Sequence, residues 1–143
     1  MYQISKIFRF EAAHHLPNHD GKCQRVHGHS WVATVTVACP RLVRQGSKQG
    51  MVMDFGDLKA VVQPIIDQYL DHWDLNETIP VYPTSENIAC WLFERITTTR
   101  TWAMLSGWSR WKSTRPAPRP VFTRKRRYEN RVYRHSTAWV ERV

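Results

Sequence analysis

The sequence is poor in cysteine, and its three cysteines, Cys23, Cys39 and Cys90, lie far apart. An odd and scattered set of cysteines does not build a disulfide framework and is typical of a reducing compartment. The chain also lacks any apolar run approaching the length of about 18 residues that spans a bilayer, and it shows no signal-peptide pattern at its start. We therefore expect a cytoplasmic protein that makes no membrane contact.

Several common catalytic signatures are also missing. The sequence contains no Gly-rich phosphate-binding loop, no Ser-His-Asp order and no internal repeat. Its 143 residues, of which 42% are hydrophobic, suit one domain with a buried core. The chemistry of the chain therefore has to be sought in its clusters of polar residues.

Acidic residues are nearly absent from the C-terminal third of the chain. Residues 96–143 contain 12 Lys and Arg but only 2 Asp and Glu, whereas residues 1–95 contain 9 and 10. The C-terminal part has no sustained helical or strand periodicity, and it combines four tryptophans with the segments Arg115–Pro120 and Arg124–Arg127. We divide the chain into a core, residues 1–95, and an atypical basic region, residues 96–143.

Two segments of the core alternate apolar and polar residues and are predicted to be strands. The first runs from Tyr2 to Glu11 and ends just before His14, and the second runs from Ser30 to Cys39. His27 and His29 precede the second strand with Gly28 between them, so their side chains share one face of an extended segment.

Three histidines of this region form a candidate metal site. Neutral imidazole is the commonest zinc ligand, and three histidines with an open fourth position are typical of catalytic zinc. The alternative is that the His-x-His pattern is an accident and each ring is an ordinary polar residue. Because pairing of the two strands brings His14 beside His27 and His29, we predict zinc at these three residues and treat His15 and His19 as bystanders.

Cys23 stands close to this candidate site. A free cysteine is by default a small buried hydrophobe, which we accept for Cys39 and Cys90. Lys22 and Arg25 flank Cys23, and a nearby cation would also favour its thiolate form, so Cys23 is a candidate general base or nucleophile.

Two helices follow the strands. Asp54 is the expected N-cap of the first, whose apolar residues from Leu58 to Tyr69 recur at helical spacing, with a kink expected at Pro64. Thr84 or Ser85 caps the second, and its periodicity ends near Arg95. Capping alone explains Thr84, Ser85 and Glu86.

The loop between the two helices contains the pair Asp71-His72. One interpretation is a histidine that interacts favourably with the dipole at a helix C-terminus. The other is a carboxylate that orients the imidazole for proton transfer. The residues alone leave both interpretations open.

Four segments, taken in order, resemble the 6-pyruvoyltetrahydropterin synthase family. They are Phe10–His14, the Cys-x3-His-Gly-His segment Cys23–His29, the Leu-Asp-His-x2-Leu-Asn segment Leu70–Asn76, and Pro83–Asn87. The spacing of Cys23 from His27, and Ser30 after the last histidine, look most like the bacterial branch, 6-carboxytetrahydropterin synthase of the 7-deazapurine (queuosine) pathway. The resemblance covers residues 2–95.

The resemblance implies an α+β tunnelling fold (T-fold). In this fold an antiparallel four-stranded sheet carries two helices on one face, three chains form a barrel, and two trimers form a hexamer. It also implies conversion of 7,8-dihydroneopterin triphosphate into 6-carboxy-5,6,7,8-tetrahydropterin, with loss of acetaldehyde and triphosphate.

The same resemblance assigns roles to individual residues. By position, His14, His27 and His29 would bind Zn²⁺, Cys23 would be the general base, and Asp71 and His72 would relay protons. Thr84, Ser85 and Glu86 fall where the family contacts the pterin substrate. The 6-pyruvoyl product remains an alternative, because no short motif distinguishes the two activities.

The basic C-terminal region departs from the family pattern. The family ends in a β-hairpin with a Val-x-Glu-Thr-x-Thr-Ser-like motif whose glutamate anchors the pterin, whereas Lys112–Arg119 contains no glutamate. Codons chosen for this segment encode Val-Tyr-Glu-Thr-Arg-Thr-Ser when read two bases later, so we hypothesise a shifted reading frame in place of the last two strands. The alternative is a genuine extension that binds nucleic acid through its arginines and tryptophans beside a zinc site.

Overall fold

The computed structural model describes the backbone of residues 1–105 and 136–142 and the side chains of residues 1–105. The elements follow one another as β1 (Tyr2–His14), the 3-10 helix η1 (Lys22–Gln24), β2 (His27–Cys39), α1 (Phe55–Tyr69), β3 (Trp73–Asp74), α2 (Leu75–Thr78), α3 (Ser85–Thr98), α4 (Arg100–Leu105) and β4 (Ser136–Arg142). The region Lys112–Arg119, where the family motif was sought, lies outside the described residues.

β1 and β2 form a long antiparallel ribbon. Both strands extend further than the alternation of residues predicted: β1 includes His14, and β2 already begins at His27. The register pairs His14 directly with His27 and Ala12 with His29. The predicted ends were wrong because pairing between strands continues through residues whose own alternation is weak.

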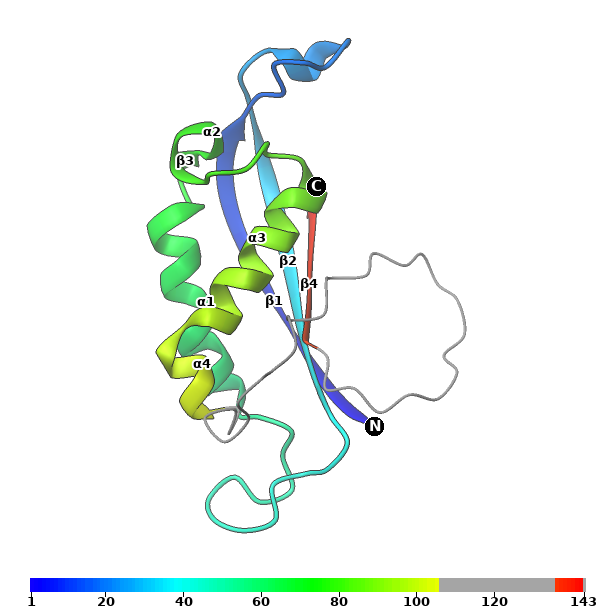
Figure 1. The fold of residues 1–143 in the computed structure, drawn as a ribbon, viewed down its shortest axis with the longest axis vertical. Helices are drawn as coiled ribbons and strands as arrows, with labels where there is room; N and C mark the ends of the chain where they lie inside the picture. Colours follow the sequence, from blue (N-terminus) through cyan, green and yellow to red (C-terminus); the bar gives the residue numbers. More distant parts are fainter. Residues whose placement is uncertain (106–135, 143) are drawn as a thin grey trace, which may run out of the picture.

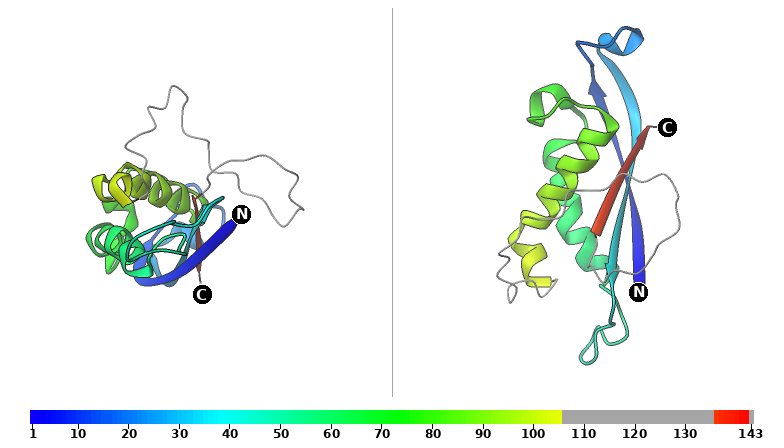
Figure 2. Two further views of the ribbon diagram at one scale, coloured as in Figure 1. Left: turned by 90° about the horizontal axis from the view of Figure 1, so that it is seen from below. Right: turned by 45° about the vertical axis from the view of Figure 1, so that its right-hand side comes forward.

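The sheet has the order β3-β1-β2-β4, and its helices lie on one face (Figure 1). β4 pairs antiparallel with β2, and β3 pairs parallel with β1 over two residues. The view from below in Figure 2 places α1, α3 and α4 together on one side of the strands. This arrangement is the α+β architecture expected from the sequence, with a short parallel strand added.

The helix-facing side of the ribbon forms one wall of the core. Phe8, Phe10, Trp31, Ala33 and Val35 are all buried, as alternation predicts. The residues between them in sequence are more exposed, as the burial patterns of both strands show. The face of the ribbon turned away from the helices therefore remains largely open in one chain.

α1 forms as its sequence predicts. The Asp54 carboxylate accepts hydrogen bonds from the backbone N–H groups of Gly56 and Asp57, which caps the first turn. The helix continues through Pro64 to Tyr69. Its buried stripe packs into the core and consists of Leu58, Val61, Val62, Ile65 and Ile66.

α3 and α4 extend the ordered helical layer beyond Arg95. Thr84 is the N-cap of α3, which runs to Thr98, and α4 follows directly. Ile96 and Trp102 are buried in the core. The boundary proposed after residue 95 thus falls inside a helix. In the described ranges, no helix is both long and apolar enough to cross a membrane.

Candidate metal centre

Three histidines meet at one end of the β1–β2 ribbon. His14 ends β1, and His27 and His29 begin β2 on the same helix-facing side. Their ring centroids lie 4.6 to 5.2 Å apart, and one ligand nitrogen from each lies within 4.8 Å of the other two. Among the described residues this is the one such group that could hold a metal ion, and it is the group predicted from the spacing.

Backbone carbonyls select the tautomer of two of these rings. Nδ1 of His14 lies 2.7 Å from the carbonyl oxygen of Pro83, and Nδ1 of His27 lies 2.6 Å from that of Arg25. Because a carbonyl only accepts, Nδ1 carries the proton in each neutral ring and Nε2 keeps its lone pair. The Nε2 atoms of all three histidines are buried. Three buried Nε2 atoms meet here, and carbonyl groups hold the opposite Nδ1–H groups of His14 and His27. This arrangement fits a divalent cation.

Trp31 supports the site from the core. Its indole is fully buried, and its ring meets His14 and His29 edge-on at centroid distances of 5.1 and 5.5 Å. The indole N–H donates to the carbonyl oxygen of Ala12 at 3.2 Å. The two histidines therefore rest on a side chain that packing and a hydrogen bond keep in place.

The Asp71 carboxylate contacts the His72 ring, which is one of the two arrangements that the loop sequence allowed. Nδ1 of His72 lies 3.0 Å from one carboxylate oxygen of Asp71, and the other oxygen accepts from the backbone N–H of Glu11 at 2.9 Å. His72 has a left-handed backbone, with φ of 62°, and donates its own N–H to the Glu11 carbonyl. The carboxylate thus orients the ring, whose side chain is 77% exposed and accessible to a ligand.

Cys23 lies in η1 within the loop that joins the two strands and is half-buried. The loop closes on itself because the Leu16 N–H donates to the Cys23 carbonyl at 2.7 Å. The thiol is not a member of the histidine cluster. The structure therefore places Cys23 in the loop between two of the candidate ligands, without adding it to the ligand set.

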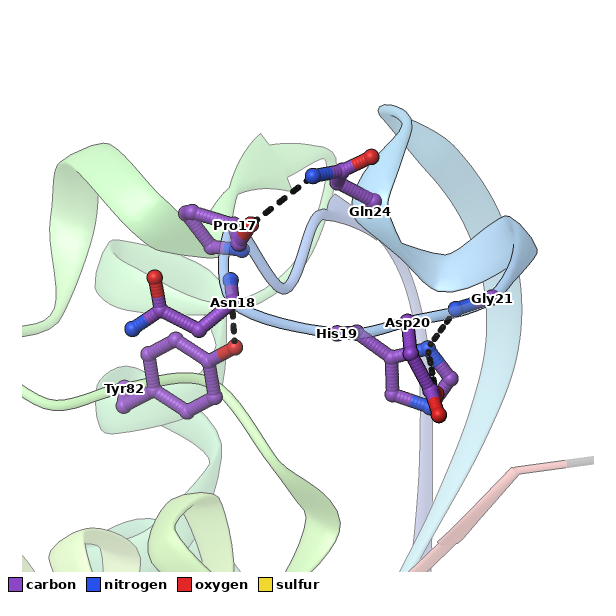
Figure 3. Close-up of polar contacts among 7 residues, drawn as sticks. All are labelled: Pro17, Asn18, His19, Asp20, Gly21, Gln24 and Tyr82. Carbon is purple, nitrogen blue, oxygen red and sulfur yellow. Dashed lines mark hydrogen bonds and ion pairs between the residues drawn. The ribbon is translucent and has the colours of Figure 1, made fainter.

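The hydroxyl of Tyr82 reaches this loop from the segment before α3 (Figure 3). It accepts the backbone N–H of Asn18 at 3.3 Å, while Gln24 donates to the Pro17 carbonyl at 3.2 Å. His19, taken as a bystander, accepts the Gly21 N–H at Nδ1, and the same atom lies 3.7 Å from a carboxylate oxygen of Asp20 at the exposed rim. Tyr82 thus links the Cys23 loop to the segment that contains Pro83, whose carbonyl bonds to His14.

The three residues expected near a substrate begin α3. The Thr84 hydroxyl accepts the Asn87 N–H at 3.3 Å, which is the capping role foreseen from sequence. Ser85 is half-buried and Glu86 exposed in the first turn. Their contact with a substrate stays a prediction.

Cys39 and Cys90 were predicted to be buried, but the structure leaves both only partly buried. Cys90 lies on α3 with its sulfur 4.0 Å from a carboxylate oxygen of Glu94. Burial, and then the negative charge of Glu94, raise the pKa of its thiol above the ordinary value. Cys90 therefore stays protonated near neutral pH.

Comparisons with known proteins agree on one family. A family model described as 6-pyruvoyl tetrahydropterin synthase matches residues 3–106. A Synechocystis protein named 6-carboxy-5,6,7,8-tetrahydropterin synthase is 52% identical over 97 residues, which cover 67% of this chain and 75% of the relative. The Haemophilus influenzae protein of the same name is 46% identical over 72 residues, half of each chain.

Solved structures give the same result at the level of the fold. The 6-pyruvoyl tetrahydropterin synthase of Caenorhabditis elegans superposes with a TM-score of 0.56 and 28% identity, covering 68% of this chain and 77% of that one. The Plasmodium falciparum enzyme of the same name, at 16% identity and a TM-score of 0.51, matches in fold.

Proposed function

Since the chain belongs to the 6-pyruvoyl tetrahydropterin synthase family, we propose that it is a zinc-dependent lyase, a 6-carboxy-5,6,7,8-tetrahydropterin synthase. Its substrate would be 7,8-dihydroneopterin triphosphate, and its products 6-carboxytetrahydropterin, acetaldehyde and triphosphate, with uptake of a water molecule. The observation that carries the proposal is the convergence of three histidines at 4.8 Å or less, beside an oriented Asp-His pair. Two relatives with this name, at 52% and 46% identity, support this product over the 6-pyruvoyl alternative.

Nε2 atoms of His14, His27 and His29 would hold the zinc, each on a ring whose other nitrogen is turned away from the ion. For His14 and His27, the carbonyls of Pro83 and Arg25 fix this orientation. When bound, the zinc supplies Lewis-acid stabilisation for negative charge on substrate oxygens. A set of three imidazoles with one position left for substrate suits this chemistry.

His72 and Cys23 would move the protons. Asp71 accepts the Nδ1–H of His72 and leaves Nε2 to exchange a proton with the substrate. The Cys23 thiolate would act as the base on the other side of the carbon chain. The first turn of α3, with Thr84, Ser85 and Glu86, would contact the pterin.

The remaining features of the proposal concern setting and assembly. Ile7, on the sheet face turned away from the helices, is 57% exposed, which supports burial of this face in a barrel of three chains. The resemblance implies that two such trimers form a hexamer. The three free cysteines support a cytoplasmic enzyme, and the queuosine pathway is what the resemblance to the bacterial branch implies. Gel filtration tests the hexamer, and a monomeric elution volume contradicts it.

The decisive assay is incubation of the zinc-loaded protein with 7,8-dihydroneopterin triphosphate. We expect release of triphosphate and acetaldehyde and a product with the mass of 6-carboxytetrahydropterin. A pyruvoyl product without acetaldehyde would establish the alternative activity. Because residues 112–119 lack the glutamate that the family uses, we expect a low rate, and resequencing codons 96–119 tests the shifted-frame hypothesis.

A further inference from the structure

The side-chain amide of Asn76 holds the backbone of the residue after His14. Its Oδ1 accepts the N–H of His15 at 2.8 Å, and its Nδ2 donates to the carbonyl oxygen of His15 at 3.0 Å. A neighbouring strand would satisfy these two backbone groups in the same way. Asn76 therefore acts as a single peptide group added to the edge of β1.

This contact is the last in a series of contacts that hold the end of β1. Glu11 is held by Asp71 and by the N–H of His72, and β3 pairs next to it through Ala12 with Trp73 and Ala13 with Asp74. Asn76 then holds His15. Every residue of β1 from Glu11 to Ala13, and the residue after His14, is thus tied to the loop that carries His72.

Asn76 is itself held in place. Its backbone N–H donates to the carboxylate of Asp74 at 2.9 Å, which caps the short helix α2. The amide therefore meets His15 from a fixed support, which is what preorganisation of a neighbouring ligand requires.

We propose that Asn76 is a positioning residue for the metal ligand His14. The carbonyl of Pro83 orients the His14 ring, and Asn76 fixes the backbone from which that ring projects. This role rests on the metal site of the proposed function. Without the amide, the end of β1 gains freedom that metal binding has to remove, so the affinity for the ion falls.

The test is the affinity of the metal-free protein for Zn²⁺, measured by competition with a chelator, together with the visible spectrum of the Co²⁺-loaded protein. Asn76→Asp keeps the size and the acceptor for the His15 N–H but turns a second acceptor towards the His15 carbonyl. We expect about tenfold weaker Zn²⁺ binding and altered Co²⁺ bands. Asn76→Ala, which removes both bonds, should behave alike.

Thr78→Val is the matched control. It removes the side-chain hydrogen bonds from Thr78 to the carbonyl oxygens of Tyr69 and Asp74, neither of which belongs to β1. We expect its Zn²⁺ affinity to stay within about twofold of the wild type. Equal losses in Asn76→Asp and Thr78→Val would make Asn76 merely structural and overturn the proposal, as would an unchanged affinity in Asn76→Asp.

A measurement on the wild type covers the case in which the variants do not fold. Coupling is reciprocal, so Zn²⁺ should slow hydrogen exchange of the His15 amide by about tenfold more than that of Ile79, whose N–H bonds within α2. Equal slowing at both amides overturns the proposal. A wild type that binds no Zn²⁺ at all rejects the metal site itself, which is a different result from failure of the Asn76 role.

Discussion

The two ends of the β1–β2 ribbon share the same strands and the same alternation but are held very differently. At the end with the histidines, side chains and backbone groups from the loop 71–76 and from Pro83 bond to Glu11, His14 and His15. At the other end, Ser5 bonds to Thr36 across the ribbon, Lys6 lies over the Phe55 ring, and Ile4 packs against the edge of the core.

The difference shows that long-range hydrogen bonds to β1 are concentrated at the histidine end of the ribbon. Antiparallel pairing forms both ends of the ribbon, with alternate residues buried from Phe8 onward in β1 and only partly buried before it. Hydrogen bonds between residues 60 to 69 positions apart occur at the end where the three histidine rings converge and where the pair Asp71-His72 meets β1. We expect substitutions at the histidine end to change metal binding or activity, and substitutions at the other end to change stability slightly.

His27→Ala should have the largest effect. It removes one of three imidazoles and should weaken Zn²⁺ binding by about 100-fold or more, since the site then falls to two protein ligands. Chelator competition measures the affinity. His19→Ala, which removes a histidine from the nearby exposed loop, should bind Zn²⁺ like the wild type. Similar losses in both variants would contradict the assigned cluster.

Asp71→Asn should separate metal binding from proton transfer. The amide oxygen still accepts the Glu11 N–H, but the side chain no longer favours the Nδ1–H form of His72. We expect kcat to fall by about 100-fold with Zn²⁺ affinity nearly unchanged.

The control for Asp71→Asn is Asp67→Asn, on the exposed face of α1, where the carboxylate accepts only from Gln63 among the described residues. Triphosphate release over a pH series compares the two variants. An unaltered rate and pH profile in Asp71→Asn would show that the ion pair is only a helix-end contact.

Tyr82→Phe should loosen the loop of Cys23. The change removes the acceptor of the Asn18 N–H, which contributes about 1 kcal/mol to holding the loop. Hydrogen exchange at the Asn18 amide should become several-fold faster. Tyr2→Phe, at the opposite end of the ribbon, should leave that amide unchanged, and equal effects in both would remove the distinction between the ends.

Lys6→Ala should have the smallest effect. It removes the contact of the ammonium group with the Phe55 ring, 5.7 Å from the ring centroid. At such a site we expect a loss of about 0.5 kcal/mol in the free energy of unfolding and no change in Zn²⁺ affinity. Urea denaturation measures the first and chelator competition the second; a loss of metal affinity would show that the ends are coupled.

Features that depend on neighbouring residues could be predicted from sequence. The cap at Asp54, the buried stripe of α1 and the shared face of His27 and His29 follow from spacing alone. The hydrogen bonds that hold the histidine ligands in place could not be predicted in the same way. The bonds from Pro83 to His14, and from Asn76 to His15, join residues more than 60 positions apart and involve backbone groups, which carry no residue signature.

The boundary placed after residue 95 also shows how far local sequence patterns can predict this fold. Sequence periodicity fails after Arg95, yet α3 runs to Thr98, Trp102 is buried, and the family model matches as far as residue 106. Threonines at 97, 98 and 99 conceal the helix because their propensity is low, while their hydroxyls bond back to carbonyls of the preceding turn. Tertiary packing overrides this local preference.

The most direct test of the central claim is a Zn²⁺ titration of the metal-free wild type beside a variant in which His14, His27 and His29 are all alanine. Three imidazoles that converge on one point predict one tightly bound ion per chain in the wild type and none in the variant. A wild type that binds no zinc, or a variant that binds it equally well, would contradict the account.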